Sequence, residues 1–227
     1  MGRVGVEVHI SLLVGLPLFA LWAAQRMSVA VMASLLTHGS ALAGPVTWAL
    51  VMTLGLVLAV TLHQMAHLIV ARWVGVAIDR MTLWAPGIVR LPRAIVPARR
   101  VVIALAGPLV SLTGAFVTHL CAYHQTQLDV RVALTALADV QLALGLIDLV
   151  PALPLDGGVL LEAALEPHWG RARSTSLVIT IGRCLAIGLA LSSVLLASSP
   201  SIAMTAVIWA GSEAAAEKAR QPVVNLR

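Results

Sequence analysis

Residues 45–71 read PVTWALVMTLGLVLAVTLHQMAHLIVA, and this stretch decides the class of fold. An α-helix needs about 20 apolar residues to cross the hydrocarbon core of a bilayer, and the stretch is longer than that. Its most polar part is LHQMAHL, residues 62–68, in which His63 and His67 stand four positions apart. The stretch therefore predicts a membrane-spanning helix that carries two imidazoles on one face.

The composition of the whole chain agrees with a membrane protein. Of its 227 residues 59% are hydrophobic and 11% are charged, whereas a soluble domain has roughly 45–50% and about 25%. The net charge of +5 does not indicate nucleic acid, because the arginines lie between apolar runs, as in membrane proteins. Cys121 and Cys184 lie in apolar segments with no Cys-x-x-Cys pattern, so we expect two small buried side chains and no disulfide framework.

The apolar runs predict an all-α polytopic membrane protein built as one domain over residues 1–227. About six spans are expected, at 9–25, 45–71, 101–122, 131–150, 175–197 and 201–220. The N-terminal run is interpreted as a retained span, because Glu7 and His9 interrupt the region where a signal peptide would be basic. Between the second and third spans, prolines, glycines and short apolar runs predict a small membrane-associated β-hairpin in the region 80–98.

The distribution of basic residues predicts the orientation. If the N-terminus is cytoplasmic, all of the 15 lysines and arginines except Arg26 and Arg131 fall on the cytoplasmic side. This asymmetry is typical of multi-pass proteins. It favours six spans in the cell membrane with both termini in the cytoplasm.

The histidine pair has two interpretations. Positions four apart on a helix can grip one metal ion, or both imidazoles can be buried and hydrogen-bonded to neighbours. Ionisable residues inside a span are costly and usually functional, which favours a metal. A catalytic zinc needs a third protein ligand, and Asp156 in VPALPLDGGVLLEAAL is the best candidate, since Pro151 and Pro154 break the helix before it. The alternative for Asp156 is a turn or N-cap aspartate at the membrane surface.

Together these residues resemble a known family. LHQMAHL is similar to the His-Glu-x-x-His helix of zinc metalloproteases, and DLVPALPLDGG resembles the Asn-x-x-Pro-x-x-Pro-Leu-Asp-Gly-Gly signature of the site-two protease family of intramembrane metalloproteases. IALAGPLVSL and IWAGSEAAAE resemble that family's third and last spans. No inserted PDZ domain or C-terminal CBS pair is evident, so the sequence resembles a minimal core form.

The resemblance implies an intramembrane zinc metalloprotease with His63, His67 and Asp156 as ligands. The implied substrate is a single-span membrane protein, such as an anti-sigma factor, cut within the lipid bilayer in regulated intramembrane proteolysis. An upstream site-one-type protease often trims such a substrate first.

Gln64 departs from the family pattern, which has Glu there. Glu takes a proton from the attacking water and returns one to the leaving amine, a role worth roughly 10²–10⁴-fold in rate. Gln has nearly the same shape but no basic carboxylate. We therefore expect a chain that keeps zinc but is inactive or severely impaired. The alternatives are a natural pseudoprotease that binds membrane helices without cleaving them, and a small metal-binding transporter.

Substrate contacts are predicted at two further places. Asp148 replaces the Asn of the family signature, where it either helps to position substrate or makes a purely structural contact. Gly87, Ile88 and Val89 are predicted to form an exposed strand edge that pairs with an unwound substrate by strand addition.

Overall fold

The computed structural model describes residues 5–8, 45–76, 80–83, 88–89, 95–196 and 199–220. Their contacts divide the chain into two compact units. The first comprises Met1–Ile69, Asp79–Arg90 and Gly107–Leu146, and the second comprises Val70–Ile78, Leu91–Ala106 and Ile147–Arg227.

Long helices dominate the described residues. They are α2 (Pro45–Trp73), α3 (Pro97–Tyr123), α4 (Leu128–Asp148), α5 (Asp156–Trp169), α6 (Arg171–Leu196) and α7 (Ser199–Arg220). Proline opens α2 and α3, at the position where its missing N–H costs nothing and its fixed φ suits a helix. Helices α2, α3, α4 and α6 contain segments long and apolar enough to cross a membrane, in agreement with four of the predicted spans.

The other two predicted spans have a different outcome. The span at 9–25 lies outside the described residues. The one at 201–220 coincides with the helix α7, but α7 is not among the described helices that meet the criterion of length and apolarity. The count of six spans therefore stays a prediction.

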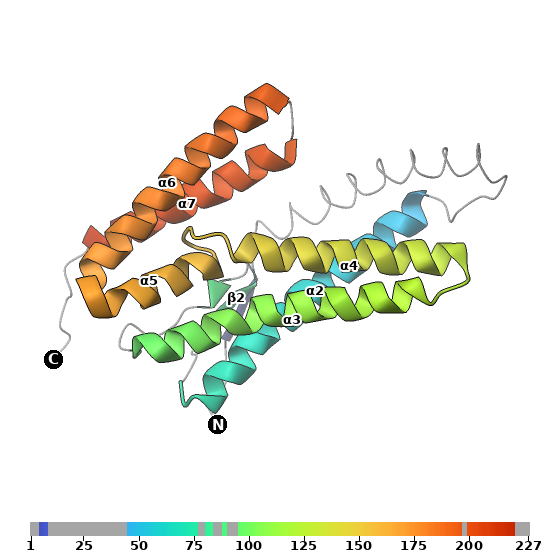
Figure 1. Cartoon of the computed structure of the whole chain (residues 1–227), viewed down its shortest axis with the longest axis horizontal. Coiled ribbons are helices and arrows are strands. Elements are labelled where there is room, and N and C mark those ends of the chain that lie inside the picture. The colour runs from blue at the N-terminus through green and yellow to red at the C-terminus, as the bar shows by residue number, and fades with distance from the viewer. Residues whose placement is uncertain are drawn as a thin grey trace. The chain divides into compact units, whose positions relative to one another are not determined.

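In the first unit, α3 and α4 run side by side (Figure 1) and approach closely through glycines. A Cβ atom built on Gly114 of α3 would lie within 3.0 Å of the Gln141 side chain of α4. The Gln141 amide in turn donates a hydrogen bond to Thr118 Oγ1 at 3.2 Å. Small residues and side-chain hydrogen bonds of this kind join helices where lipid replaces water, because apolar burial alone gives little drive there.

The first unit also contains a small sheet in the order β1-β2-β3. Strand β1 (Gly5–Val8) pairs in parallel with β2 (Arg80–Leu83), which pairs antiparallel with β3 (Ile88–Val89). Residues 84–87 lie outside the described part, so the closed hairpin and its membrane association stay predictions. The parallel strand β1 was not expected in a chain predicted to be all-α with one hairpin.

In the second unit, α6 and α7 lie side by side, and α5 packs on α6 (Figure 1). Their core consists of the buried residues Ala152, Leu155, Ala186 and Ile208. Arg183 lies inside α6 and pairs with Glu213 of α7 at 2.7 Å. The two cysteines are exposed rather than buried, which corrects the expectation of two buried side chains.

A buried ionic cluster joins α3, α5 and α6 within this unit. Arg100 of α3 is 3% exposed and pairs with Glu162 at 3.6 Å and with Glu166, both on α5. Glu162 also accepts a hydrogen bond of 2.5 Å from Thr175 Oγ1 and lies 3.9 Å from Arg171 Nε, both on α6. One carboxylate thus connects three helices.

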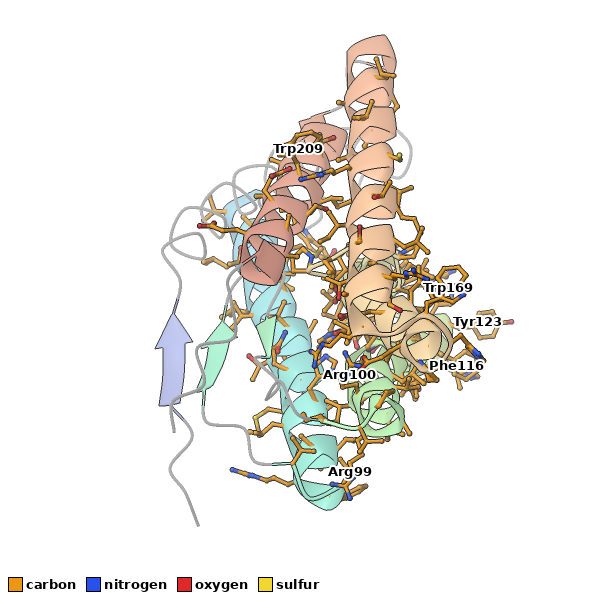
Figure 2. All side chains as sticks on the ribbon, turned by 90° about the vertical axis from the view of Figure 1, so that its left-hand side faces the viewer. Arg99, Arg100, Phe116, Tyr123, Trp169 and Trp209 are labelled. Atoms are coloured by element: carbon orange, nitrogen blue, oxygen red, sulfur yellow. The ribbon has the colours of Figure 1, made fainter. Side chains whose placement is uncertain are left out.

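Arg99, the preceding residue, provides a natural contrast. Arg100 lies among neighbouring side chains, whereas Arg99 is exposed and projects away from them (Figure 2). We expect Arg100→Ala to destabilise the protein by about 3 kcal/mol, the lower value for breaking a buried pair, because Glu166 is only partly buried and Glu162 keeps Arg171 nearby. Arg99→Ala is the matched control and should change stability by less than about 0.5 kcal/mol. Thermal unfolding in detergent micelles measures the stability of both variants. Equal losses of stability would contradict a stabilising role for the ionic cluster.

Candidate metal centre

His63 and His67 occupy one buried face of α2. Their side chains are 2% and 3% exposed, and their Nε2 atoms lie 3.1 Å apart. The spacing of four residues along a helix of 3.6 residues per turn brings the two rings together. The structure thus places both imidazoles as the sequence predicted, with the same ring nitrogen of each directed to one point.

Gly107 of α3 lies against that point. A Cβ atom built on Gly107 would come within 3.0 Å of the Nε2 atoms of both histidines, a distance that real Cβ atoms essentially never reach. Only glycine therefore leaves the two nitrogens as close to α3 as they are.

The geometry of the pair fits a metal ion. Two nitrogens that bind one tetrahedral zinc at about 2.0–2.1 Å stand roughly 3.3 Å apart, close to the 3.1 Å observed between His63 and His67. Imidazole nitrogen is also a preferred zinc donor. The distance between the two nitrogens therefore suits two ligand positions of one ion.

The other ring nitrogen of His63 has its own partner. Its Nδ1 lies 3.0 Å from the hydroxyl of Ser111, which is buried on α3 one turn after Gly107. The motif IALAGPLVSL contains both Gly107 and Ser111, but the sequence predicted no role for either residue. A glycine and a serine four apart in an apolar helix were the available signal, since such residues share a face.

Gln64 follows His63 on α2 and is 1% exposed. Its Oε1 atom is buried and has no hydrogen-bond partner among the described residues. A buried carbonyl oxygen without a donor is uncommon in native proteins. Gln64 therefore presents an unsatisfied acceptor beside the histidine pair.

Asp156 and Asp148 belong to the second unit. Asp156 is the first residue of α5, preceded by Leu155 in extended conformation, and it is partly buried. A carboxylate at this position is favoured by the partial positive charge of a helix N-terminus. Gly157 and Gly158 follow, and a Cβ atom on either would clash with the backbone of residues 149–153. Asp148 is the last residue of α4 and is buried.

The remaining predicted site residues lie at the sheet. Ile88 and Val89 form strand β3, which follows β2 at one end of the strand order. Gly87 lies outside the described residues. Nothing in the structure tests the substrate-binding role predicted for this edge, so that role stays a prediction.

Comparison with known proteins identifies relatives of this chain. No protein-family model matches the sequence. A zinc metalloprotease of Methanocaldococcus jannaschii is 31% identical over 167 residues, which cover 73% of this chain and 49% of that protein. Rip3 of Mycobacterium tuberculosis, named as a candidate zinc metalloprotease, is 37% identical over 133 residues, covering 55% of this chain and 34% of Rip3. The chain thus spans about half of the first relative and about a third of the second.

A solved structure extends the likeness to nearly the whole chain. The site-2 protease of Methanocaldococcus jannaschii superposes with a TM-score of 0.68 at 26% identity, covering 98% of this chain and 94% of that chain. This match and the relatives named as zinc metalloproteases agree with the histidine pair on α2, and together they support the site-two protease family for this chain.

Proposed function

We propose that this chain is the membrane-embedded catalytic core of a zinc metalloprotease that acts on single-span membrane proteins in the bilayer. The observation that carries the proposal is the convergence of the His63 and His67 Nε2 atoms against Gly107. Glycine at position 107 lets both ring nitrogens lie against α3, and a larger residue there would displace them. The apolar helices on which these residues lie support a reaction at membrane depth.

Asp156 is proposed as the third ligand. Each of the three residues offers one ligand atom, a ring nitrogen or a carboxylate oxygen, and two histidines with one carboxylate form a known zinc donor set. When bound, zinc supplies a Lewis acid that polarises the scissile carbonyl. The protein fixes the donors: α2 holds the imidazoles, and the glycines after Asp156 let the start of α5 pack closely on the preceding loop.

Gln64 is proposed to impair the proton transfers of the reaction. Its amide oxygen can accept a hydrogen bond from the attacking water, and its NH2 group can donate one to it. Neither group can take a proton from the water. This residue also favours a second candidate function, a pseudoprotease that binds membrane helices without cleaving them. A metal-binding transporter is the least favoured alternative, since the solved structure that the chain resembles over nearly its whole length is a site-2 protease.

The proposed setting is the cell membrane, with both ends of the chain in the cytoplasm, as the distribution of arginines favours. The substrate is proposed to unwind and add its backbone to the edge formed by Gly87, Ile88 and Val89, because helical peptide bonds are shielded from attack. Asp148 is proposed to contact the substrate near the metal. An upstream site-one-type protease would supply trimmed substrate, as in related pathways.

Metal content tests the ligand set. We expect the purified protein to hold about one zinc per chain, and His67→Ala and Asp156→Ala to lose most of it, because two donors bind zinc far more weakly than three. His119→Ala, which changes an exposed histidine of α3, is the matched control and should keep its zinc. Elemental analysis after dialysis against a weak chelator measures this. A metal-free wild-type chain would overturn the proposed function.

Restoring the carboxylate separates the enzyme from the pseudoprotease. Gln64→Glu should raise zinc-dependent cleavage of a single-span reporter by at least about 10²-fold, the lower range for a general base. Gln64→Ala should not raise it. Product formation in proteoliposomes, with and without chelator, is the measurement. If Gln64→Glu binds zinc and still fails to cleave, the pseudoprotease is supported instead.

Substrate capture tests the strand edge. Replacing Ile88 with Gly and Val89 with Ser should weaken crosslinking of a reporter substrate several-fold, because a flexible edge pairs poorly with an added strand. The zinc content should not change. Crosslinking yield beside metal analysis distinguishes these effects, and undiminished capture would refute the role of the edge.

A further inference from the structure

Ser111 is a side chain of another helix that meets His63, and it carries no role in the reaction described above. Its hydroxyl lies 3.0 Å from His63 Nδ1, and the residue is 3% exposed. A buried hydroxyl aimed at one nitrogen of an imidazole has a direct consequence for the other nitrogen, because neutral imidazole carries its proton on only one of the two.

We propose that Ser111 is a positioning residue that fixes His63 as an Nε2 metal donor. The Nδ1–H of His63 donates to the Ser111 hydroxyl oxygen, so the lone pair is left on Nε2. That is the atom that lies 3.1 Å from His67 Nε2 and packs against Gly107. Partners of this kind orient a metal-bound histidine and raise its basicity, and their loss typically costs 10–100-fold in metal affinity. The inference rests on the proposed function.

The two contacts of α3 come from one face of that helix. Gly107 and Ser111 stand one turn apart, so the helix gives space to both Nε2 atoms at the first position and a hydrogen bond to Nδ1 at the second. Serine at position 111 therefore belongs to the metal centre in the same sense as glycine at 107.

Helix α4 packs against Ser111 through Gly145. A Cβ atom built on Gly145 would lie 3.2 Å from Ser111 Cβ and 3.0 Å from the side chain of Leu112. Glycine therefore lets α4 pack closely against the turn of α3 that carries the hydroxyl. Three helices act in sequence: α4 holds Ser111, Ser111 orients His63, and His63 presents Nε2.

Ser111→Ala tests the proposal, since it removes only the hydroxyl oxygen. Zinc affinity, measured by competition with a chromophoric chelator on the full chain in detergent, should fall about 10–100-fold. The cobalt-substituted protein should show altered d–d absorption, because the donor geometry changes. Thermal unfolding of the metal-free protein measures separately the cost of leaving the buried His63 Nδ1–H unpaired, which we expect to be about 1–3 kcal/mol.

Ser212→Ala is the matched control, because Ser212 is also a buried helical serine and its hydroxyl has no hydrogen-bond partner among the described residues. It should leave zinc affinity and the cobalt spectrum unchanged. If Ser111→Ala binds zinc as tightly as wild type with the same cobalt spectrum, the inference is overturned while the proposed function stands. If only the metal-free stability falls, the role of Ser111 is structural. A wild-type chain that binds neither metal would overturn the proposed function itself.

Discussion

The close approach of α2 to α3 at Gly107 is the constraint on which the rest of the site depends. It permits two imidazoles to direct their Nε2 atoms to one point 3.1 Å apart, and it brings Ser111 within hydrogen-bond distance of His63. A methyl group at position 107 would occupy the place of both nitrogens. The site is therefore built by packing between helices as much as by the donor residues, which explains why glycine and serine, residues without metal chemistry of their own, belong to it.

The sequence predicted those features that depend on local pattern. Apolar length predicted α2, α3, α4 and α6 to within a few residues, and a spacing of four predicted that His63 and His67 share a face. It did not predict features that depend on distant partners. Strand β1 pairs with β2 more than 70 residues later in the chain, and the alternation of Val6, Glu7 and Val8 is too short to indicate that partner. Gly107 and Ser111 acquire their roles only from the register of α3 against α2.

Arg100 illustrates the same difference in electrostatics. From the sequence, Arg100 was one of several arginines in a basic segment, and it served only to predict the orientation in the membrane. In the fold it is buried and pairs with Glu162 and Glu166 on α5, the helix that begins at Asp156. Charges inside a low-dielectric region persist only where they are paired. The carboxylates of α5 thus have a cation at a fixed place on α3, so the ionic cluster constrains the helix that presents the proposed third ligand.

Gln64 shows that metal binding and proton transfer can depend on different residues of one helix. Its amide is nearly the same shape as the carboxylate of Glu, so the packing around a residue that is 1% exposed hardly distinguishes the two. Charge does distinguish them, because a carboxylate buried to this extent stays ionised only beside a positive charge. The neutral amide has no such requirement. Helix α2 can therefore keep its histidine pair in place with Gln64, whereas a glutamate there would depend on the metal ion that the same histidines are proposed to hold.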